Sequence, residues 1–194
     1  LEEGIISKND RIVCAGAYRF GNRTFKDLHV HGSTNIVEAI QRSCNVFFYQ
    51  LMLKVGFEKW VEYSQRFGFG QPTGIDIGEE TQGLVPTPAY FDRVYGKGKW
   101  TQGYLISLAI GQGEVGVSPL QMACYAAALA NGGTLHQPHA VASLRNKRLN
   151  RAEEVGHRSR KIGISAATME IILEVMPLVV QEPGGTVGGA RNAG

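Results

Sequence analysis

The fold of this chain is decided by the stretch Ser43-Cys44-Asn45-Val46-Phe47-Phe48-Tyr49-Gln50-Leu51-Met52-Leu53-Lys54-Val55. From Val46 to Val55 the apolar residues leave hardly any polar face, and a helix that is hydrophobic on all sides must be buried. We therefore expect a central helix over residues 46–55. Ser43 and Asn45 lie in the turn before it, where a hydroxyl and an amide can share one cleft.

Two further helices are expected beside the central one. The first organised segment begins at Asn35, which forms a capping pair with Glu38, and the helix that they start runs to about Arg42. On the other side, the segment from Glu58 to Phe67 has apolar residues at helical spacing and ends at Gly68.

The middle of the chain predicts a loop, a helix and a strand. Residues 78–103 are rich in Gly and Pro with little periodicity, which indicates a long ordered loop. The run Ser118-Pro119-Leu120-Gln121 is a strong helix start, and its helix is expected to continue to Ala130. A strand is expected over residues 134–143.

The segment from Arg145 to Lys161 is basic, with seven Lys or Arg against two Glu. A solvated hairpin or loop is the simpler interpretation, and a site for an anionic polymer or lipid head groups is the alternative. A last helix begins at Ser165 and is expected to kink at Pro177. Helices early and strand material late indicate a domain with a helical half and a sheet half.

Composition limits the class of protein. The 194 residues are 43% hydrophobic and 19% charged, with a formal net charge of +3. These values are typical of one globular domain that can bury a core. The charge is too small to indicate a nucleic-acid partner. No apolar run approaches the roughly 20 residues of a membrane-spanning helix, and no signal peptide opens the chain.

Ser43 and Asn45 carry the side chains that acyl transfer uses beside its nucleophile. This reaction needs a nucleophile, a group that moves its proton, and donors that position the scissile amide. A hydroxyl both donates and accepts, so Ser43 can relay a proton, while Asn45 can bind a substrate amide. The alternative is that both residues only cap helices.

Two further features indicate no additional chemistry. Gly111-Gln112-Gly113 lacks the Lys and spacing of a phosphate loop and the third Gly of a dinucleotide fingerprint, so we expect close backbone packing beneath the cleft and no nucleotide site. The three cysteines, Cys14, Cys44 and Cys124, are an odd number and poor evidence for a disulfide framework. Cys124 is expected to be a small core residue.

Three segments resemble class B penicillin-binding proteins, most closely the elongation type, penicillin-binding protein 2. Ser43 to Leu51 is similar to the family's Ser-x-Asn box and the helix behind it, Gly68 to Asp76 is similar to its next turn, and Gly111 to Met122 completes the signature. The resemblance covers nearly the whole chain. It implies an α+β fold of two subdomains, similar to serine β-lactamases. Residues 1–194 would be a partial transpeptidase domain, mostly the helical half with part of the sheet half.

Two of the three sequence boxes of penicillin-recognising enzymes are absent. These enzymes use Ser-x-x-Lys, Ser-x-Asn and Lys-[Ser/Thr]-Gly. Here no Ser is followed three places later by Lys, and no Lys begins Lys-Thr-Gly or Lys-Ser-Gly. In the family, the first box runs into a segment similar to Leu1 to Ile6, and the third follows one similar to Gly184-Gly185-Thr186. The chain therefore resembles an internal piece between these boxes, and we expect it to be inactive alone.

The resemblance implies serine acyl-enzyme chemistry in the parent protein. That protein would be a D,D-transpeptidase that cross-links peptidoglycan stem peptides and is acylated by β-lactams, with Ser43 and Asn45 as its catalytic residues in this chain. Acyl transfer would need no cofactor. The implied partners are the stem peptide, β-lactams and proteins of wall elongation. The implied location is the extracytoplasmic, periplasmic side of the inner membrane, with the membrane anchor outside this chain.

The resemblance also implies a metal site beside the Ser-x-Asn box. Some elongation-type members hold zinc there with acidic residues, a His about thirteen positions before the box, and the Cys inside it. Here His31 stands thirteen positions before Cys44, Asp27 lies nearby, and Cys14 stands where another Asp is expected. These four residues would form a tetrahedral structural Zn²⁺ site, in which His29 could replace His31 or Asp27. The alternative is three buried thiols with both His residues on a polar loop.

Two rival functions use the same residues. A non-catalytic penicillin-recognising sensor, or a scaffold of the wall-elongation assembly, would share the fold and lack the nucleophile. A free-standing zinc-binding module is less favoured, because the apolar helix over residues 46–55 demands neighbours.

Overall fold

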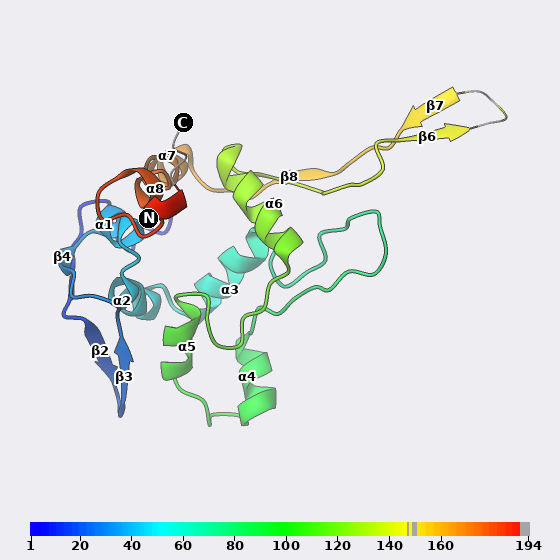
Figure 1. The fold of residues 1–194 in the computed structure, drawn as a ribbon. Coiled ribbons are helices and arrows are strands. Elements are labelled where there is room, and N and C mark those ends of the chain that lie inside the picture. Colours follow the sequence, from blue (N-terminus) through cyan, green and yellow to red (C-terminus); the bar gives the residue numbers. More distant parts are fainter. Residues whose placement is uncertain (147, 149–150, 191–194) are drawn as a thin grey trace. The chain divides into compact units, whose positions relative to one another are not determined.

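The computed structural model describes residues 1–146, 148 and 151–190, and it contains both helices and strands (Figure 1). The chain forms two compact units. Unit 1 comprises Leu1–Val61, Pro86–Val115 and Ser165–Gly194, and unit 2 comprises Glu62–Val85 and Gly116–Ile164. The mixture of helix and strand confirms the α+β class that the sequence predicts.

Unit 1 begins with four short strands in two antiparallel pairs. They are β1 (Ile12–Cys14) with β4 (Gly32–Thr34), and β2 (Ala17–Phe20) with β3 (Arg23–Lys26). Gly21, with a φ of 58°, opens the two-residue turn between β2 and β3, where a positive φ is needed. The expectation that organised structure begins at Asn35 is therefore wrong. Strands of three or four residues are too short to show a clear alternation of apolar and polar residues.

The two helices expected around Ser43 are confirmed as α1 (Ile36–Gln41) and α2 (Asn45–Val55). The predicted capping box is present, because Glu38 N donates to Asn35 Oδ1 at 3.0 Å and Asn35 N donates to Glu38 Oε2 at 3.2 Å. α2 contacts α1, α5 (Gly103–Leu108) and the strands β1, β2 and β3. α2 is therefore the central helix of unit 1, and it buries Val46, Phe47, Tyr49 and Met52.

A second core in unit 1 is aromatic. Phe57, at the start of α3 (Phe57–Arg66), lies 5.3 Å from Phe91 between ring centroids, and both rings are buried. Phe91 lies on α4 (Pro88–Tyr95), so the expectation of a continuous loop over residues 78–103 is wrong. The sequence does contain a helix-start signal here, Thr87 followed by Pro88. In the structure, Thr87 Oγ1 accepts from Tyr90 N at 3.1 Å, and Pro88 is the first helical residue.

The last helical segment of unit 1 is interrupted at the residue expected to kink it. α7 (Ala166–Val175) begins after Ser165, whose Oγ accepts from Thr168 N at 3.2 Å. Pro177 then precedes α8 (Leu178–Gln181), and a short 3-10 helix, η1, follows at Gly188–Ala190. Both α7 and α8 contact α1.

The described residues of unit 2 form one further helix and two antiparallel strand pairs. α6 (Pro119–Ala130) has the predicted capping box, with Gln121 N donating to Ser118 Oγ at 3.1 Å. The strand pairs are β5 (Thr134–His136) with β8 (Ser159–Lys161), and β6 (Ser143–Asn146) with β7 (Arg151–Glu154). The β6–β7 pair confirms a hairpin in the basic segment, of which residues 147, 149 and 150 lie outside the described residues. The single strand expected over residues 134–143 is wrong, because the chain leaves β5 after His136.

Gln121 is the buried polar side chain that organises the loops of unit 2. Its Nε2 donates to the carbonyl oxygens of Gln71 at 2.8 Å and Gln82 at 2.9 Å. Beside it, a Cβ at Gly83 would lie 2.5 Å from the carbonyl oxygen of Gly116, so this close approach admits only glycine. The close backbone packing expected at Gly111 and Gly113 occurs here instead. A Cβ at Gly111 would meet nothing within 4 Å, and a Cβ at Gly113 would make an ordinary contact with the Ser107 side chain at 3.4 Å. Both glycines adopt a positive φ, of 71° and 83°.

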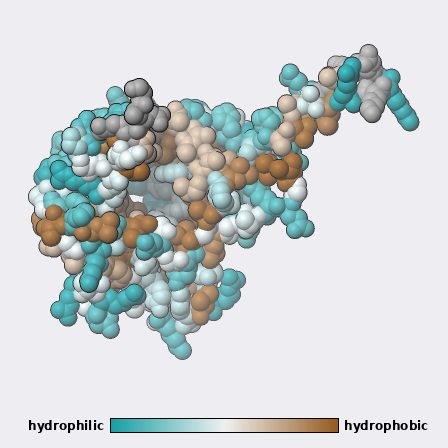
Figure 2. Space-filling model, viewed as in Figure 1, coloured by the Kyte–Doolittle hydropathy of each residue, from teal (hydrophilic) through white to brown (hydrophobic). Residues whose placement is uncertain are grey.

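The visible surface intersperses hydrophobic with hydrophilic residues (Figure 2). Exposed apolar side chains include Leu28 and Val30, at 76% and 74% exposure, on the loop between β3 and β4. Across the described residues, no helix combines the length and apolar character that crossing a bilayer requires.

Candidate functional site

Ser43 and Cys44 form the turn between α1 and α2. Ser43 N donates to Ile40 O at 3.2 Å, and Cys44 N donates to Ala39 O at 2.8 Å. These two bonds form a Schellman motif, in which the residue at the place of Ser43 takes a left-handed conformation. Ser43 accordingly has a φ of 52°, and in the part of the chain that the structure describes it is the sole non-glycine residue with a positive φ.

The left-handed conformation strains Ser43. An L-residue in this region costs about 1–2 kcal/mol, whereas glycine adopts it without a steric penalty. Strain of this kind gathers at functional sites, where the surrounding structure enforces it. The Ser43 side chain is exposed, and its Oγ lies 2.7 Å from Thr186 Oγ1. The turn therefore presents a hydroxyl that is open to a ligand and held by one neighbour.

Asn45 is the first residue of α2, directly after the N-cap residue Cys44. The Cys44 side chain makes no cap bond, and the N–H of Val46 in the first turn donates instead to Asp27 Oδ2 at 2.9 Å. The start of α1 is capped by Asn35. Among the described residues, the side chains that accept from the N-terminal N–H groups of α1 and α2 are thus those of Asn35 and Asp27, so capping of helix N-termini does not explain the side chains of Ser43 and Asn45.

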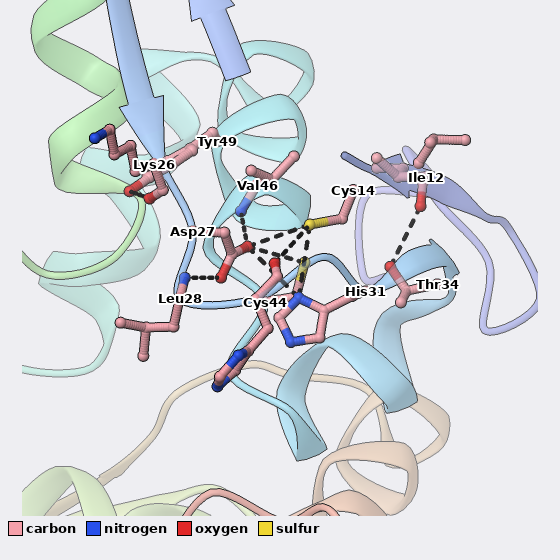
Figure 3. A network of polar contacts seen from close by, with 12 residues as sticks. Ile12, Cys14, Lys26, Asp27, Leu28, His31, Thr34, Cys44, Val46 and Tyr49 are labelled. Carbon is pink, nitrogen blue, oxygen red and sulfur yellow. Dashed lines mark hydrogen bonds and ion pairs between the residues drawn. The ribbon is translucent and has the colours of Figure 1, made fainter. Parts of the chain in front are cut away.

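Cys14, Asp27, His31 and Cys44 meet beside the same turn (Figure 3). Their ligand atoms all lie within 4.8 Å of one another. The two sulfur atoms each lie 3.4 Å from Asp27 Oδ2, and His31 Nδ1 lies 3.6 Å from Cys14 Sγ and 3.7 Å from Asp27 Oδ2. The structure therefore brings together the four residues that are expected as metal ligands from the sequence.

Three short strands and one helix position this cluster. Cys14 ends β1, Asp27 follows β3, His31 precedes β4, and Cys44 precedes α2. The pairing of Cys14 with Gly32 across β1 and β4 sets the His31 segment beside Cys14. Residues that are separated by up to 30 positions in the sequence are thus joined by local strand pairing.

The electrostatics of the cluster depend on Asp27. Burial alone would raise the pKa of this carboxyl, but the N–H groups of Val46 and Leu28 and the thiols of Cys14 and Cys44 donate to it and hold its pKa below the ordinary value. Burial, followed by the neighbouring Cys14 and Asp27, raises the pKa of the Cys44 thiol to about 12. Without a cation, the Cys44 thiol therefore stays protonated at neutral pH.

The donor set and its spacing fit a zinc ion. Zinc binds sulfur at about 2.3 Å and nitrogen or oxygen at about 2.0–2.2 Å in a tetrahedron, so neighbouring ligand atoms should be about 3.3–3.8 Å apart. Four of the six separations between the ligand atoms, at 3.4, 3.4, 3.6 and 3.7 Å, fall in this range, and the other two lie within 4.8 Å. Two thiols, an imidazole and a carboxylate are also ligands that zinc accepts.

Two other candidate residues lie outside the cluster. The His29 ring is 6.1 Å from the His31 ring between centroids, and His29 contributes its backbone oxygen, 3.7 Å from Cys14 Sγ. Cys124 is partly buried and lines a cavity of about 740 Å³ in unit 2, so the expectation of a core position is wrong. Burial raises the pKa of the Cys124 thiol, which makes it a poor nucleophile.

One residue near Ser43 is missed by sequence reasoning. The sequence assigns Gly184-Gly185-Thr186 no contact with the Ser-x-Asn box and only a resemblance to the segment before the third box, yet Thr186 contacts Ser43 from 143 positions away. No local pattern signals a contact over this separation. The available signals are a hydroxyl residue directly after two glycines and the resemblance of this segment to the one before the third box.

Comparisons with known proteins agree on one family. The family described as the penicillin binding protein transpeptidase domain matches residues 1–194. Peptidoglycan D,D-transpeptidase MrdA of Haemophilus influenzae is 36% identical over 146 residues, which are 73% of this chain and 22% of that protein. The chain thus spans about a fifth of the length of this curated relative.

Solved structures share the fold. Pseudomonas aeruginosa penicillin-binding protein 2 in complex with WCK 5153 superposes with a TM-score of 0.83 at 26% identity, over 98% of this chain and 44% of that one. A structure described as a peptidoglycan synthase complex that coordinates polymerization and crosslinking gives a TM-score of 0.77 at 27% identity, over 93% of this chain and 30% of that one.

Proposed function

Because this chain belongs to the family of penicillin-binding protein transpeptidase domains, we propose that it is the part of a peptidoglycan D,D-transpeptidase that carries the Ser-x-Asn box of the active site. The observation that supports this most directly is the turn at Ser43. A strained, exposed serine at the end of α1 precedes an asparagine at the start of the buried helix α2.

The chemistry follows from the hydroxyl and the amide. In the proposed reaction, a serine oxygen from a flanking segment bonds to the carbonyl carbon of the penultimate D-Ala, and the bond from this carbon to the nitrogen of the terminal D-Ala breaks. The leaving nitrogen takes up the proton that the nucleophile gives up. Ser43 relays this proton because a hydroxyl accepts one and donates another, and Asn45 binds the peptide amide of the substrate.

The second half of the reaction reverses these roles. The amine of another stem peptide attacks the ester carbon, a new carbon–nitrogen bond forms, and the serine oxygen leaves with a proton that the amine supplies. β-Lactams would enter the first half and stop there as acyl-enzymes. The described chain contains Ser43 and Asn45 but neither a Ser-x-x-Lys nor a Lys-Thr-Gly box, so we expect no turnover from it alone.

We also propose that Cys14, Asp27, His31 and Cys44 hold a structural zinc ion. Zinc would supply no step of acyl transfer, because a site with four protein ligands leaves no open position for substrate. These four residues would link β1 and the loop after β3 to the residue that follows Ser43, and they would keep the Ser43 turn in place. The fit of the ligand distances, described above, supports this assignment.

Partners and location belong to the same proposal. By analogy with the peptidoglycan synthase complex described above, we propose that the parent protein works with other proteins of wall elongation. The substrate would be the stem peptide, outside the cytoplasmic membrane. A non-catalytic sensor or scaffold of this family is the alternative function, and it is distinguished by the lack of an acyl-enzyme.

Intact-mass spectrometry after penicillin treatment tests the proposal. The two samples are this chain and an extended chain, defined as this chain continued through flanking segments that include the Ser-x-x-Lys and Lys-Thr-Gly boxes. We expect an adduct on the extended chain alone, at a serine outside residues 1–194. No adduct on a folded extended chain would support the scaffold instead.

A further inference from the structure

The segment Pro183–Thr186 folds back onto the turn that carries Ser43. Thr186 N donates to the carbonyl oxygen of Gln41, at the end of α1, at 3.3 Å. Gln41 Nε2 in turn donates to the carbonyl oxygen of Pro183 at 3.1 Å. Between these two anchors, Thr186 Oγ1 lies 2.7 Å from Ser43 Oγ. The Thr186 hydroxyl is therefore held against the proposed proton relay by two contacts with Gln41, one to its carbonyl oxygen and one from its side-chain amide.

The fold of this segment is set without the Thr186 side chain. Gly184 has a φ of 83°, Gly185 N donates to Glu182 O at 3.0 Å, and Val187 N donates to Val179 O at 3.1 Å. A Cβ at Gly185 would lie 2.5 Å from the carbonyl oxygen of Val179, so the segment packs closely against α8. Since α8 contacts α1, the segment and the turn belong to one packed region of unit 1.

The hydroxyl pair can adopt two arrangements of its protons. When Thr186 donates to Ser43 Oγ, the proton of Ser43 is free to be given to another atom. When Ser43 donates to Thr186 Oγ1, the lone pairs of Ser43 are free to accept a proton. A relay needs both arrangements in turn, and a threonine hydroxyl that both donates and accepts can serve both without moving its oxygen.

We propose that Thr186 is a positioning residue for Ser43, which holds the Ser43 hydroxyl in the rotamer that relays the proton during acyl transfer. This inference rests on the proposed function of Ser43. Thr186 makes no bond to the substrate in this role. A neutral hydrogen bond in contact with water adds little to folding stability, and Ser43 is exposed, so the pair acts on the reaction rather than on the fold.

The test compares Thr186→Val, Thr186→Ser and Ser43→Ala in the extended chain, with a fluorescent penicillin as the probe. Stopped-flow measurement separates the acylation rate constant from the affinity of the non-covalent complex. We expect Thr186→Val, which keeps the shape and removes the hydroxyl, to lower the acylation rate constant about tenfold and to leave the affinity within about twofold. Thr186→Ser should restore the rate constant to within about twofold of the wild type.

The double variant identifies the residue through which Thr186 acts. If Thr186 positions Ser43, Thr186→Val should cause no further loss in the Ser43→Ala background, because the hydroxyl that it holds is gone. Equal losses in both backgrounds would overturn the proposal, as would a Thr186→Val rate equal to that of the wild type. A Thr186→Ser rate as low as that of Thr186→Val would show that the methyl group matters instead of the hydroxyl, and would also overturn it.

Failure of the proposed function gives a different result. If Ser43→Ala is acylated as fast as the wild type, Ser43 is not the proton relay. This result refutes the proposed function of Ser43, whatever the Thr186 variants show. Melting temperatures of all variants show whether they are folded. Thr186→Ala replaces Thr186→Val if the valine variant melts early, and the same expectations apply to it.

Discussion

Two helices of this chain end in the same backbone motif, and they differ in the residue that takes the left-handed position. At the end of α6, Gly132 N donates to Leu129 O at 3.2 Å and Gly133 N donates to Ala128 O at 2.7 Å. At the end of α1, the corresponding bonds run from Ser43 N to Ile40 O and from Cys44 N to Ala39 O. Gly132 has a φ of 74° and Ser43 a φ of 52°.

Under the proposed function, the glycine turn favours stability, and the serine turn accepts strain in order to place a hydroxyl in the active site. Glycine relieves the strain of the left-handed conformation at Gly132, where a Cβ would meet nothing within 4 Å. Ser43 keeps the strain and gains a hydroxyl beside Thr186. The two turns also differ in their neighbours. Cys44, directly after Ser43, belongs to the Cys14–Asp27–His31–Cys44 cluster, and among the described residues no such cluster of potential metal ligands includes a residue of the α6 turn.

The largest expected effect comes from making the two turns alike. Ser43→Gly in the extended chain should lower the rate constant of penicillin acylation by about a hundredfold or more, because proton transfer by one positioned group contributes about 10²–10⁴. The free energy of unfolding should stay equal or rise by up to about 1 kcal/mol, since relief of strain exceeds the added chain entropy. A Ser43→Gly protein that acylates normally would remove Ser43 from the mechanism.

The second prediction concerns zinc binding by the Cys14–Asp27–His31–Cys44 cluster beside the Ser43 turn. Zn²⁺ at a hundredfold excess over its dissociation constant should stabilise the extended chain by about 2.7 kcal/mol, seen as a higher melting temperature that a chelator reverses. Cys14→Ser and Cys44→Ser should abolish this response. Cys124→Ser, which alters a cysteine outside the cluster, should retain it. A response that survives loss of Cys14 and of Cys44 would place the metal elsewhere.

The reverse exchange at the α6 turn should affect stability alone. Gly132→Ser should lower the free energy of unfolding by about 1–2 kcal/mol, because it forces a side chain into the left-handed conformation. The penicillin acylation rate constant of the extended chain should remain unchanged. Denaturant unfolding and the fluorescent penicillin assay measure the two quantities, and a slower acylation would show that this turn also serves the active site.

The smallest effect is a pH dependence in unit 2. Asp76 accepts from Ala140 N at 2.7 Å and Val141 N at 2.9 Å, and these backbone bonds hold the pKa of its carboxyl below the ordinary value of 3.8. A lowered folded-state pKa stabilises the protein above the unfolded-state value, and this stability is lost as the pH falls below about 4 through the folded-state pKa.

Asp76→Asn should therefore lower the melting temperature at pH 7 by more than it does at pH 3. Glu79→Gln, which removes a neighbouring exposed carboxylate, provides the matched control for the loss of one negative charge. Melting curves over this pH range make the comparison. An equal decrease for Asp76→Asn at both pH values would contradict a role for its charge.

Sequence reasoning succeeded where structure depends on neighbours along the chain. The capping boxes at Asn35 and Ser118 and the break at Pro177 follow from side-chain chemistry within a few residues. The buried helix α2 follows from its apolar sides. The same rules should have found α4, because Thr87 and Pro88 form a start like that of α6, but the glycines around them favoured a loop.

By itself, then, the sequence predicted α1, α2, α3, α6 and α7 from local patterns, and its family resemblance named Cys14, Asp27, His31 and Cys44 as a set that the structure brings together. Only the tertiary structure decided that Ser43 takes a strained left-handed conformation, that strand pairing brings Cys14, Asp27 and His31 to Cys44, and that Thr186 reaches Ser43. The physical reason is distance along the chain. Local hydrogen bonds are readable from adjacent residues, whereas a contact between distant residues exists only after packing has closed the loop between them.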